Sequence, residues 1–290
     1  MNWLSSFTQF PKSILGNLGL GPSTQLLSSA LTDTGRKRNH NEDSILEDKT
    51  NHLYIVADGI GGHTRGEFAS SESIQIVKDL LCSETKNELP EHDKLSQVDF
   101  EDVADMSSNS FPEVNALLHA IESANKSINS KNQEELSEKK KGMGTTFVGC
   151  WFLPQHHKVI LFNVGDSRIY LFRENKLIQK TIDHSLLQYW LDHGQKGPRP
   201  NANIIVRAIG PREDTLPDVE LMNYQSGDHW LICSDGLHGM INDEELEKFF
   251  IDKIENDKLA HYDSYAQELI DMANKAGGAD NISAILIHVR

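Results

Sequence analysis

The stretch Leu53-Tyr-Ile-Val-Ala-Asp-Gly-Ile-Gly-Gly-His63 joins a short apolar run to an aspartate and a group of glycines. Residues 53–57 are apolar and are followed at once by Asp58-Gly59, a pattern that predicts a buried β-strand ending in a turn. A carboxylate at the mouth of a buried strand costs free energy unless a partner compensates for its burial. Asp58 is therefore the first candidate for a side chain that binds a cation.

The same arrangement recurs three times: an apolar run or a turn is followed by an aspartate beside a small or amide residue. The three aspartates are Asp166, Asp235 and Asp280, and the pair Glu42-Asp43 lies upstream of all of them. Sets of acidic oxygens select hard divalent cations such as Mg²⁺ and Mn²⁺, and either ion accepts an all-oxygen site. We expect these carboxylates to meet at one site that binds such cations.

The composition argues against several classes of protein. The chain has 290 residues with 43 acidic and 28 basic side chains, and its net charge of −15 disfavours a nucleic-acid-binding protein, which needs a basic surface. Its three cysteines are odd in number and lack metal-finger spacing, which favours a reducing cytoplasm over a disulfide framework. No apolar run approaches the roughly 18–20 residues of a transmembrane segment.

Residues 1–30 differ from the rest of the chain because Lys12 is their only charged residue and apolar side chains are spread among them. They are predicted to form a flexible extension or, alternatively, an amphipathic segment that docks on a partner or a membrane surface. The basic polar face that is usual at membranes is missing from them. Residues 31–290 are predicted to form the catalytic domain, with a solvated insertion near residues 82–112.

Tight turns between apolar runs predict antiparallel sheets with helices on their outer faces. The predicted strands are residues 53–57, 145–153, 158–164, 168–172, 176–181, 229–233 and 281–289. The predicted helices are residues 66–81, 113–130, 184–193, 242–254 and 264–276, and the predicted loops include residues 131–141 and 195–203. The last strand is largely apolar on both of its faces, which indicates that both faces are covered.

Six short motifs follow one another along the chain. They are Arg38…Glu42-Asp43, Val-Ala-Asp58-Gly-Ile-Gly-Gly-His, Gly-Met-Gly-Thr145-Thr, Asn-Val-Gly-Asp166-Ser-Arg-Ile-Tyr, Cys-Ser-Asp235-Gly-Leu and Gly-Ala-Asp280-Asn-Ile-Ser. In this order, from about Leu31 to Arg290, the chain resembles the bacterial branch of the metal-dependent type-2C protein serine/threonine phosphatases. The resemblance implies an α+β fold, a four-layer αββα sandwich of two antiparallel β-sheets flanked by helix pairs.

The resemblance also implies a centre of two Mn²⁺ or Mg²⁺ ions with a possible third, weaker ion. The metal ligands implied by the matching positions are Glu42, Asp58, Gly59 through its carbonyl, Asp166, Asp235 and Asp280. Asp58 would bridge the two ions, and Glu42 would lie beside one of them. Asp235 and Asp280 would hold the other ion. Asp166, together with Asp235, would hold the third.

Two further side chains are implied in the reaction. Arg38 would clamp the substrate phosphate, and Asp43 would orient water from just outside the ligands. The implied reaction is the attack of a metal-activated water on phosphorus, which displaces the serine or threonine oxygen without a covalent enzyme intermediate. Catalysis would depend above all on Arg38, Asp58 and Asp235.

The chain departs from the family pattern near the reacting atoms. Some members carry a histidine directly after the Asp-Gly pair, where this chain has Ile60. His63 is interpreted as a structural or supporting residue, with a catalytic acid as the alternative, so the general acid is left open. Residues 185–205 correspond to the family's flap, and Arg199 and Arg207 would either contact substrate or pack within it.

The predicted function is metal-dependent hydrolysis of phosphoserine and phosphothreonine on proteins in the cytoplasm, which would oppose a bacterial serine/threonine kinase. The first alternative is a pseudophosphatase that binds phosphoproteins without turnover, and a second is a phosphatase of small metabolites. All the expected acidic ligands are present, which favours an active enzyme. The sequence does not identify the physiological substrate, the ion used or the oligomeric state.

Overall fold

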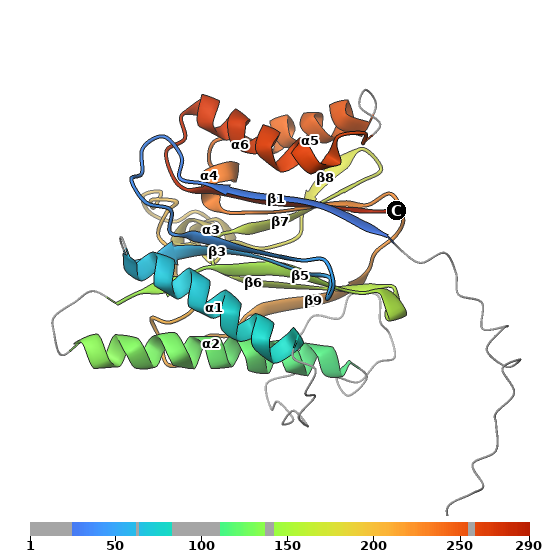
Figure 1. Ribbon diagram of the computed structural model, residues 1–290. Helices are drawn as coiled ribbons and strands as arrows, with labels where there is room; N and C mark the ends of the chain where they lie inside the picture. The colour runs from blue at the N-terminus through green and yellow to red at the C-terminus, as the bar shows by residue number, and fades with distance from the viewer. Residues whose placement is uncertain (1–24, 62–63, 83–110, 137–141, 255–258) are drawn as a thin grey trace, which may run out of the picture.

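The computed structural model describes residues 25–61, 64–82, 111–136, 142–254 and 259–290 (Figure 1). Residues 1–24 of the expected extension and residues 83–110 of the expected insertion lie outside the described residues, as does His63. In the described ranges, no helix has both the length and the apolar character needed to cross a bilayer.

Two stacked β-sheets form the centre of the fold (Figure 1). The first sheet has the order β1 (Leu26–Asp33), β11 (Ile282–Val289), β10 (His229–Cys233), β7 (Arg168–Arg173) and β8 (Lys176–Gln179). The second has the order β2 (Asp43–Asp48), β3 (Leu53–Ile60), β5 (Phe147–Leu153), β6 (Lys158–Val164) and β9 (Asp218–Asn223), with β4 (Gly144–Thr145) beside β3. All strand pairs are antiparallel, as the tight turns predicted.

Helices cover the outer face of each sheet (Figure 1). The long helices α1 (Thr64–Cys82) and α2 (Pro112–Leu136) lie against the second sheet, and α5 (Asp243–Asp252) and α6 (Tyr265–Ala276) lie against the first. In the described part of the chain, the remaining helices are the short α3 (Leu186–Asp192) and α4 (Asp235–His238) and the 3₁₀ turns η3 (Pro154–His156) and η5 (Tyr262–Ser264). The α+β sandwich of four layers is confirmed.

Apolar side chains fill the three spaces between these four layers. Between the sheets lie Val56, Val148, Trp230 and Ile285, all fully buried. Separate clusters fill the spaces between each sheet and its helices. Every residue of β11 is buried, which confirms that this strand is covered on both faces.

Strand β1 begins at Leu26, so the predicted boundary between extension and domain at residue 30 is wrong. Residues 26–30 pair with residues 285–289 of β11, which satisfies their backbone groups within the sheet. The sequence pattern missed this strand because its serines Ser28 and Ser29 interrupt the apolar run, although both are buried. Strands β2 and β9, which carry several acidic residues, were also not predicted.

Helix α2 continues to Leu136, whereas a charged loop was predicted from residue 131. The buried Asn132 explains the longer helix. Its side-chain amide donates to the Met143 carbonyl at 2.7 Å and accepts from the Met143 N–H at 2.7 Å. This pair of bonds fixes the end of α2 against the chain that enters β4, a long-range contact that no local pattern reveals.

Candidate active site

The ends of four strands bring the predicted carboxylates together at one edge of the sandwich. Asp43 and Asp58 face each other across the β2–β3 pair, and Asp235 and Asp280 flank the neighbouring strands β10 and β11. The pKa of Asp58 is raised well above its ordinary value by burial and by the negative charges of Asp43, Asp235, Asp166 and Asp280. Five carboxylates from distant parts of the sequence therefore act on one another at one site.

Several oxygens at this site are buried without a partner. Among the described residues, Oδ1 of Asp43, Asp166 and Asp235 each lack a hydrogen-bond partner. An unpaired buried carboxylate oxygen is costly, and divalent cations take such oxygens as ligands, so this donor set fits Mg²⁺ or Mn²⁺. Within the described ranges, no group of three or more His, Cys, Asp or Glu side chains has the arrangement of a complete metal site.

Asp43 lies just inside the site and is held by two hydroxyl groups. Ser234 Oγ donates to Asp43 Oδ2 at 2.8 Å, and Ser283 Oγ donates to the same oxygen at 2.7 Å. Burial, together with the nearby charges of Asp235 and Asp280, raises the pKa of Asp43 to about 7 although both hydroxyls lower it. Serine at position 283 thus has a defined contact with a site residue.

Asn281 fixes the loop that carries Arg38 and Glu42. Its side-chain oxygen accepts from the Glu42 N–H at 2.9 Å. Its amide nitrogen donates to the Thr34 carbonyl at 2.9 Å and to the His40 carbonyl at 2.8 Å. Sequence reasoning named the neighbouring Asp280 but assigned no role to Asn281, and the only signal was its place directly after that aspartate.

Glycines at positions 59 and 66 allow Glu42, the end of β3 and the first turn of α1 to approach one another closely. The Gly59 N–H donates to the Glu42 carbonyl at 3.2 Å, which joins the loop before β2 to the end of β3. A Cβ atom on Gly66 would overlap Glu42 Oε2, and a Cβ atom on Gly59 would overlap the Gly66 carbonyl. The glycines therefore allow Glu42 to lie beside Gly59.

Arg38 reaches the site from an exposed loop. Its guanidinium donates to Asp280 Oδ2 at 2.7 Å, and the arginine side chain is 52% exposed. Because more than half of this side chain faces solvent, it remains accessible to an incoming anion. Its contact with Asp280 places the positive charge of the guanidinium directly beside the carboxylates.

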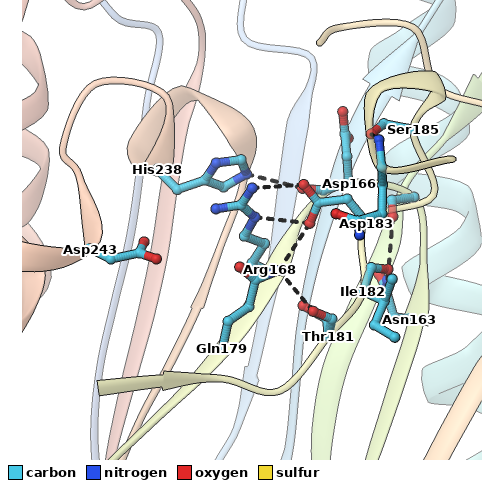
Figure 2. A network of polar contacts seen from close by, with 12 residues as sticks. Asn163, Asp166, Arg168, Gln179, Thr181, Ile182, Asp183, Ser185, His238 and Asp243 are labelled. Carbon is cyan, nitrogen blue, oxygen red and sulfur yellow. Dashed lines mark hydrogen bonds and ion pairs between the residues drawn. The ribbon is translucent and has the colours of Figure 1, made fainter. Parts of the chain in front are cut away.

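Asp166 lies on a turn between β6 and β7 that charged neighbours surround (Figure 2). His238 Nε2 donates to the Asp166 carbonyl at 3.0 Å. Arg168 forms a two-pronged ion pair with Asp183, at 2.9 and 2.7 Å, beside this turn. Burial and the charges of Asp235 and Asp183 raise the pKa of Asp166 to about 7.

A cavity of about 840 Å³ adjoins the site at the end of β3. It is lined by Ile60 and by parts of residues 203–218, which include Arg207 and Asp218. Arg207 bonds to Asp218 and to the Leu216 carbonyl, so it packs within this wall. Arg199 is exposed and is not among the lining residues, so the structure separates the two arginines that the sequence left equivalent.

Comparison with known proteins places this architecture in a family. The family model described as "Protein phosphatase 2C" matches residues 34–286. The serine/threonine phosphatase stp of Listeria welshimeri is 32% identical over 264 residues, which cover 88% of this chain and 93% of that protein. The protein phosphatase PhpP of Streptococcus pneumoniae is 33% identical over 267 residues, covering 89% and 96% of the two chains.

Solved structures give the same result. The serine/threonine phosphatase PstP/Ppp of Mycobacterium tuberculosis has a TM-score of 0.71 and 28% identity, with 91% of this chain and 98% of that chain covered. A catalytic domain of PstP in complex with two manganese ions has a TM-score of 0.69 and 29% identity, covering 92% and 99% of the two chains. This chain therefore belongs to the protein phosphatase 2C family of metal-dependent serine/threonine phosphatases.

Proposed function

We propose that this phosphatase hydrolyses phosphoserine and phosphothreonine on proteins at the site where the β3, β10 and β11 strand ends meet. The carboxylates of Glu42, Asp58, Asp166, Asp235 and Asp280 and the Gly59 carbonyl would hold Mn²⁺ or Mg²⁺. The observation that carries this assignment is the buried Oδ1 of Asp166 and of Asp235, each without a hydrogen-bond partner, beside Asp58, whose pKa burial raises. Two manganese ions in the related PstP structure support two ions here, with Asp166 and Asp235 available for a third.

The ions supply one part of the chemistry. When bound, a pair of divalent cations supplies Lewis acidity, which neutralises phosphate charge and makes water a better nucleophile near neutral pH. In the overall reaction, an oxygen from water bonds to phosphorus and the bond from phosphorus to the serine or threonine oxygen breaks. The released oxygen takes up a proton, and the products are inorganic phosphate and a free hydroxyl group.

Arg38 and Asp43 would position the substrate phosphate and the water, respectively. The half-exposed Arg38 guanidinium can donate two parallel hydrogen bonds to phosphate oxygens when it leaves Asp280. Asp43 Oδ2 is fixed by two serine hydroxyls, which leaves its buried Oδ1 to accept a hydrogen bond from water. Ile60 has no proton to give, and we propose that water protonates the leaving oxygen.

The cavity beside Ile60 supports a polypeptide substrate rather than a small metabolite. Its wall mixes charged Arg207 and Asp218 with Ile204 and Val206, which are 45% and 42% exposed. Apolar side chains exposed next to a charged centre suit a phosphorylated protein segment with side chains of both kinds. We expect the substrates to be proteins that a bacterial serine/threonine kinase phosphorylates.

The place of action and the extension are also part of this proposal. Cys82, Cys150 and Cys233 are all unpaired in the structure, which supports a reducing cytoplasm as the place of action. Residues 1–30 are proposed to dock on a partner or a membrane surface, apart from residues 26–30, which belong to β1. The relatives are named as phosphatases, so they give the pseudophosphatase alternative no support.

The test is phosphate release from a phosphothreonine peptide by the purified full chain, with Mn²⁺ and then with excess EDTA. We expect turnover that requires the ion. Asp235→Asn should reduce turnover by about 100-fold or more, because it removes ligand charge, and excess Mn²⁺ should restore it only in part. Asp252→Asn, the same change at an exposed position on α5, is the matched control. Full turnover by Asp235→Asn would refute the ligand assignment.

A further inference from the structure

His184 contacts two parts of the molecule at once. The first is the Asp166 turn, which we define as residues 165–167 between β6 and β7. The His184 N–H donates to the Gly165 carbonyl at 2.8 Å, and the Gly165 N–H donates to His184 Nδ1 at 3.0 Å. Both residues are buried, so these two bonds are shielded from water.

The second part is the pocket segment, which we define as residues 203–218 and which lines the cavity. The Val206 N–H donates to the His184 carbonyl at 2.9 Å. His184 Nε2 lies 3.0 Å from Asp218 Oδ2, and Asp218 also pairs with Arg207. One residue therefore makes backbone and ring contacts with both the wall of the cavity and the turn that carries Asp166.

The contacts determine where the proton of the His184 ring lies. The Gly165 N–H can only donate, so Nδ1 must offer its lone pair and the ring proton must be on Nε2. Nε2–H then donates to the Asp218 carboxylate. Arg207 Nη1 is also 3.0 Å from Nε2, but both are donors and both are satisfied by Asp218.

Asp218 thus acts on Gly165 through the ring. Its carboxylate stabilises the Nε2–H tautomer, and only that tautomer accepts the Gly165 N–H. Without Asp218 the proton can move to Nδ1, where it would face the Gly165 N–H and break the bond. Any event that moves Asp218 in the cavity wall therefore changes how firmly the Asp166 turn is held.

We propose that His184 is a positioning residue that couples the cavity wall to the Asp166 turn. The functional meaning of this coupling rests on the proposed function, in which the cavity receives the phosphoprotein and Asp166 holds an ion. Coupling between two sites is reciprocal, so an ion at Asp166 and a peptide in the cavity change each other's affinity by the same factor. The physical link is one imidazole ring with two bonded nitrogens.

The test measures amide hydrogen exchange at Gly165 in the full chain, without ions or substrate. Asp218→Ala should accelerate exchange at Gly165 about five-fold, the value of one ordinary hydrogen bond. Glu213→Ala, which removes another exposed carboxylate from the pocket segment, is the matched control and should change nothing. In a His184→Asn background, where the shorter side chain still accepts from Gly165 but cannot reach Asp218, adding Asp218→Ala should have no further effect.

Two results would overturn the proposal. One is that Asp218→Ala leaves amide exchange at Gly165 unchanged. The other is that Asp218→Ala accelerates this exchange in the His184→Asn background as much as it does in the wild-type protein. If His184→Asn does not fold, the comparison of Asp218→Ala with Glu213→Ala still decides. Calorimetric Mn²⁺ titration should show weaker binding in Asp218→Ala by up to about five-fold, since one hydrogen bond limits the coupling. The exchange result involves no catalysis, so failure of the proposed function would be seen separately, as a lack of turnover.

Discussion

Replacing Asn281 by alanine tests how the loop with Arg38 and Glu42 is held. The side chain is 5% exposed and makes three hydrogen bonds, to the Glu42 N–H and to the carbonyls of Thr34 and His40. At about 1 kcal/mol each, their loss lowers the free energy of unfolding by about 3 kcal/mol. Because Glu42 and Arg38 lie on the released loop, turnover should fall as well.

Asn281→Asp gives a sharper version of the same test. An aspartate keeps an acceptor for the Glu42 N–H but turns an oxygen toward the carbonyls of Thr34 and His40. It also adds a negative charge to a site that already holds several carboxylates. Asn281→Asp should therefore destabilise the protein more than Asn281→Ala, although it is the closer analogue in shape.

The assay is urea unfolding at pH 7 followed by fluorescence, with phosphopeptide turnover measured on the same preparations. Asn223→Ala, at an exposed asparagine on β9, is the control and should change the free energy of unfolding by less than about 0.5 kcal/mol. A loss below about 1 kcal/mol in Asn281→Ala, or greater stability of Asn281→Asp than of Asn281→Ala, would refute the reasoning.

Two further changes test other parts of the structure. Gly66→Ala should raise the Mn²⁺ concentration needed for half-maximal turnover, because its Cβ would displace the Glu42 carboxylate; an unchanged metal titration would contradict this. Burial and the facing His288 lower the pKa of His229 to about 3. The folded protein therefore binds fewer protons at this ring than the unfolded chain does. As a result, its free energy of unfolding decreases as the pH falls below about 6.5. Urea unfolding should show that His229→Phe loses about 1.5 kcal/mol less stability than wild type between pH 6.5 and 5; equal losses would contradict the assignment.

Local patterns account for the parts of the fold that were predicted correctly. Residues 53–57 and 230–233 are continuous apolar runs that end at turn residues, and both lie in strands. The same patterns placed Asp58 and Asp235 near strand ends; in the structure Asp58 lies two residues before the end of β3 and Asp235 two residues after the end of β10. Strands β1 and β9 lack such a run, because serines or acidic residues alternate with their apolar side chains.

The sequence by itself determined the class of fold, the acidic residues at the strand ends and, through the order of the motifs, the family. It could do so because apolar periodicity and turn chemistry act over a few residues and are written in consecutive positions. Only the tertiary structure decided that Ser234 and Ser283 hold Asp43, that Asn281 holds a loop some 240 residues away in sequence, and that His184 joins the cavity wall to the Asp166 turn. These contacts depend on which strand ends lie side by side, and that is fixed by the packing of the whole sandwich.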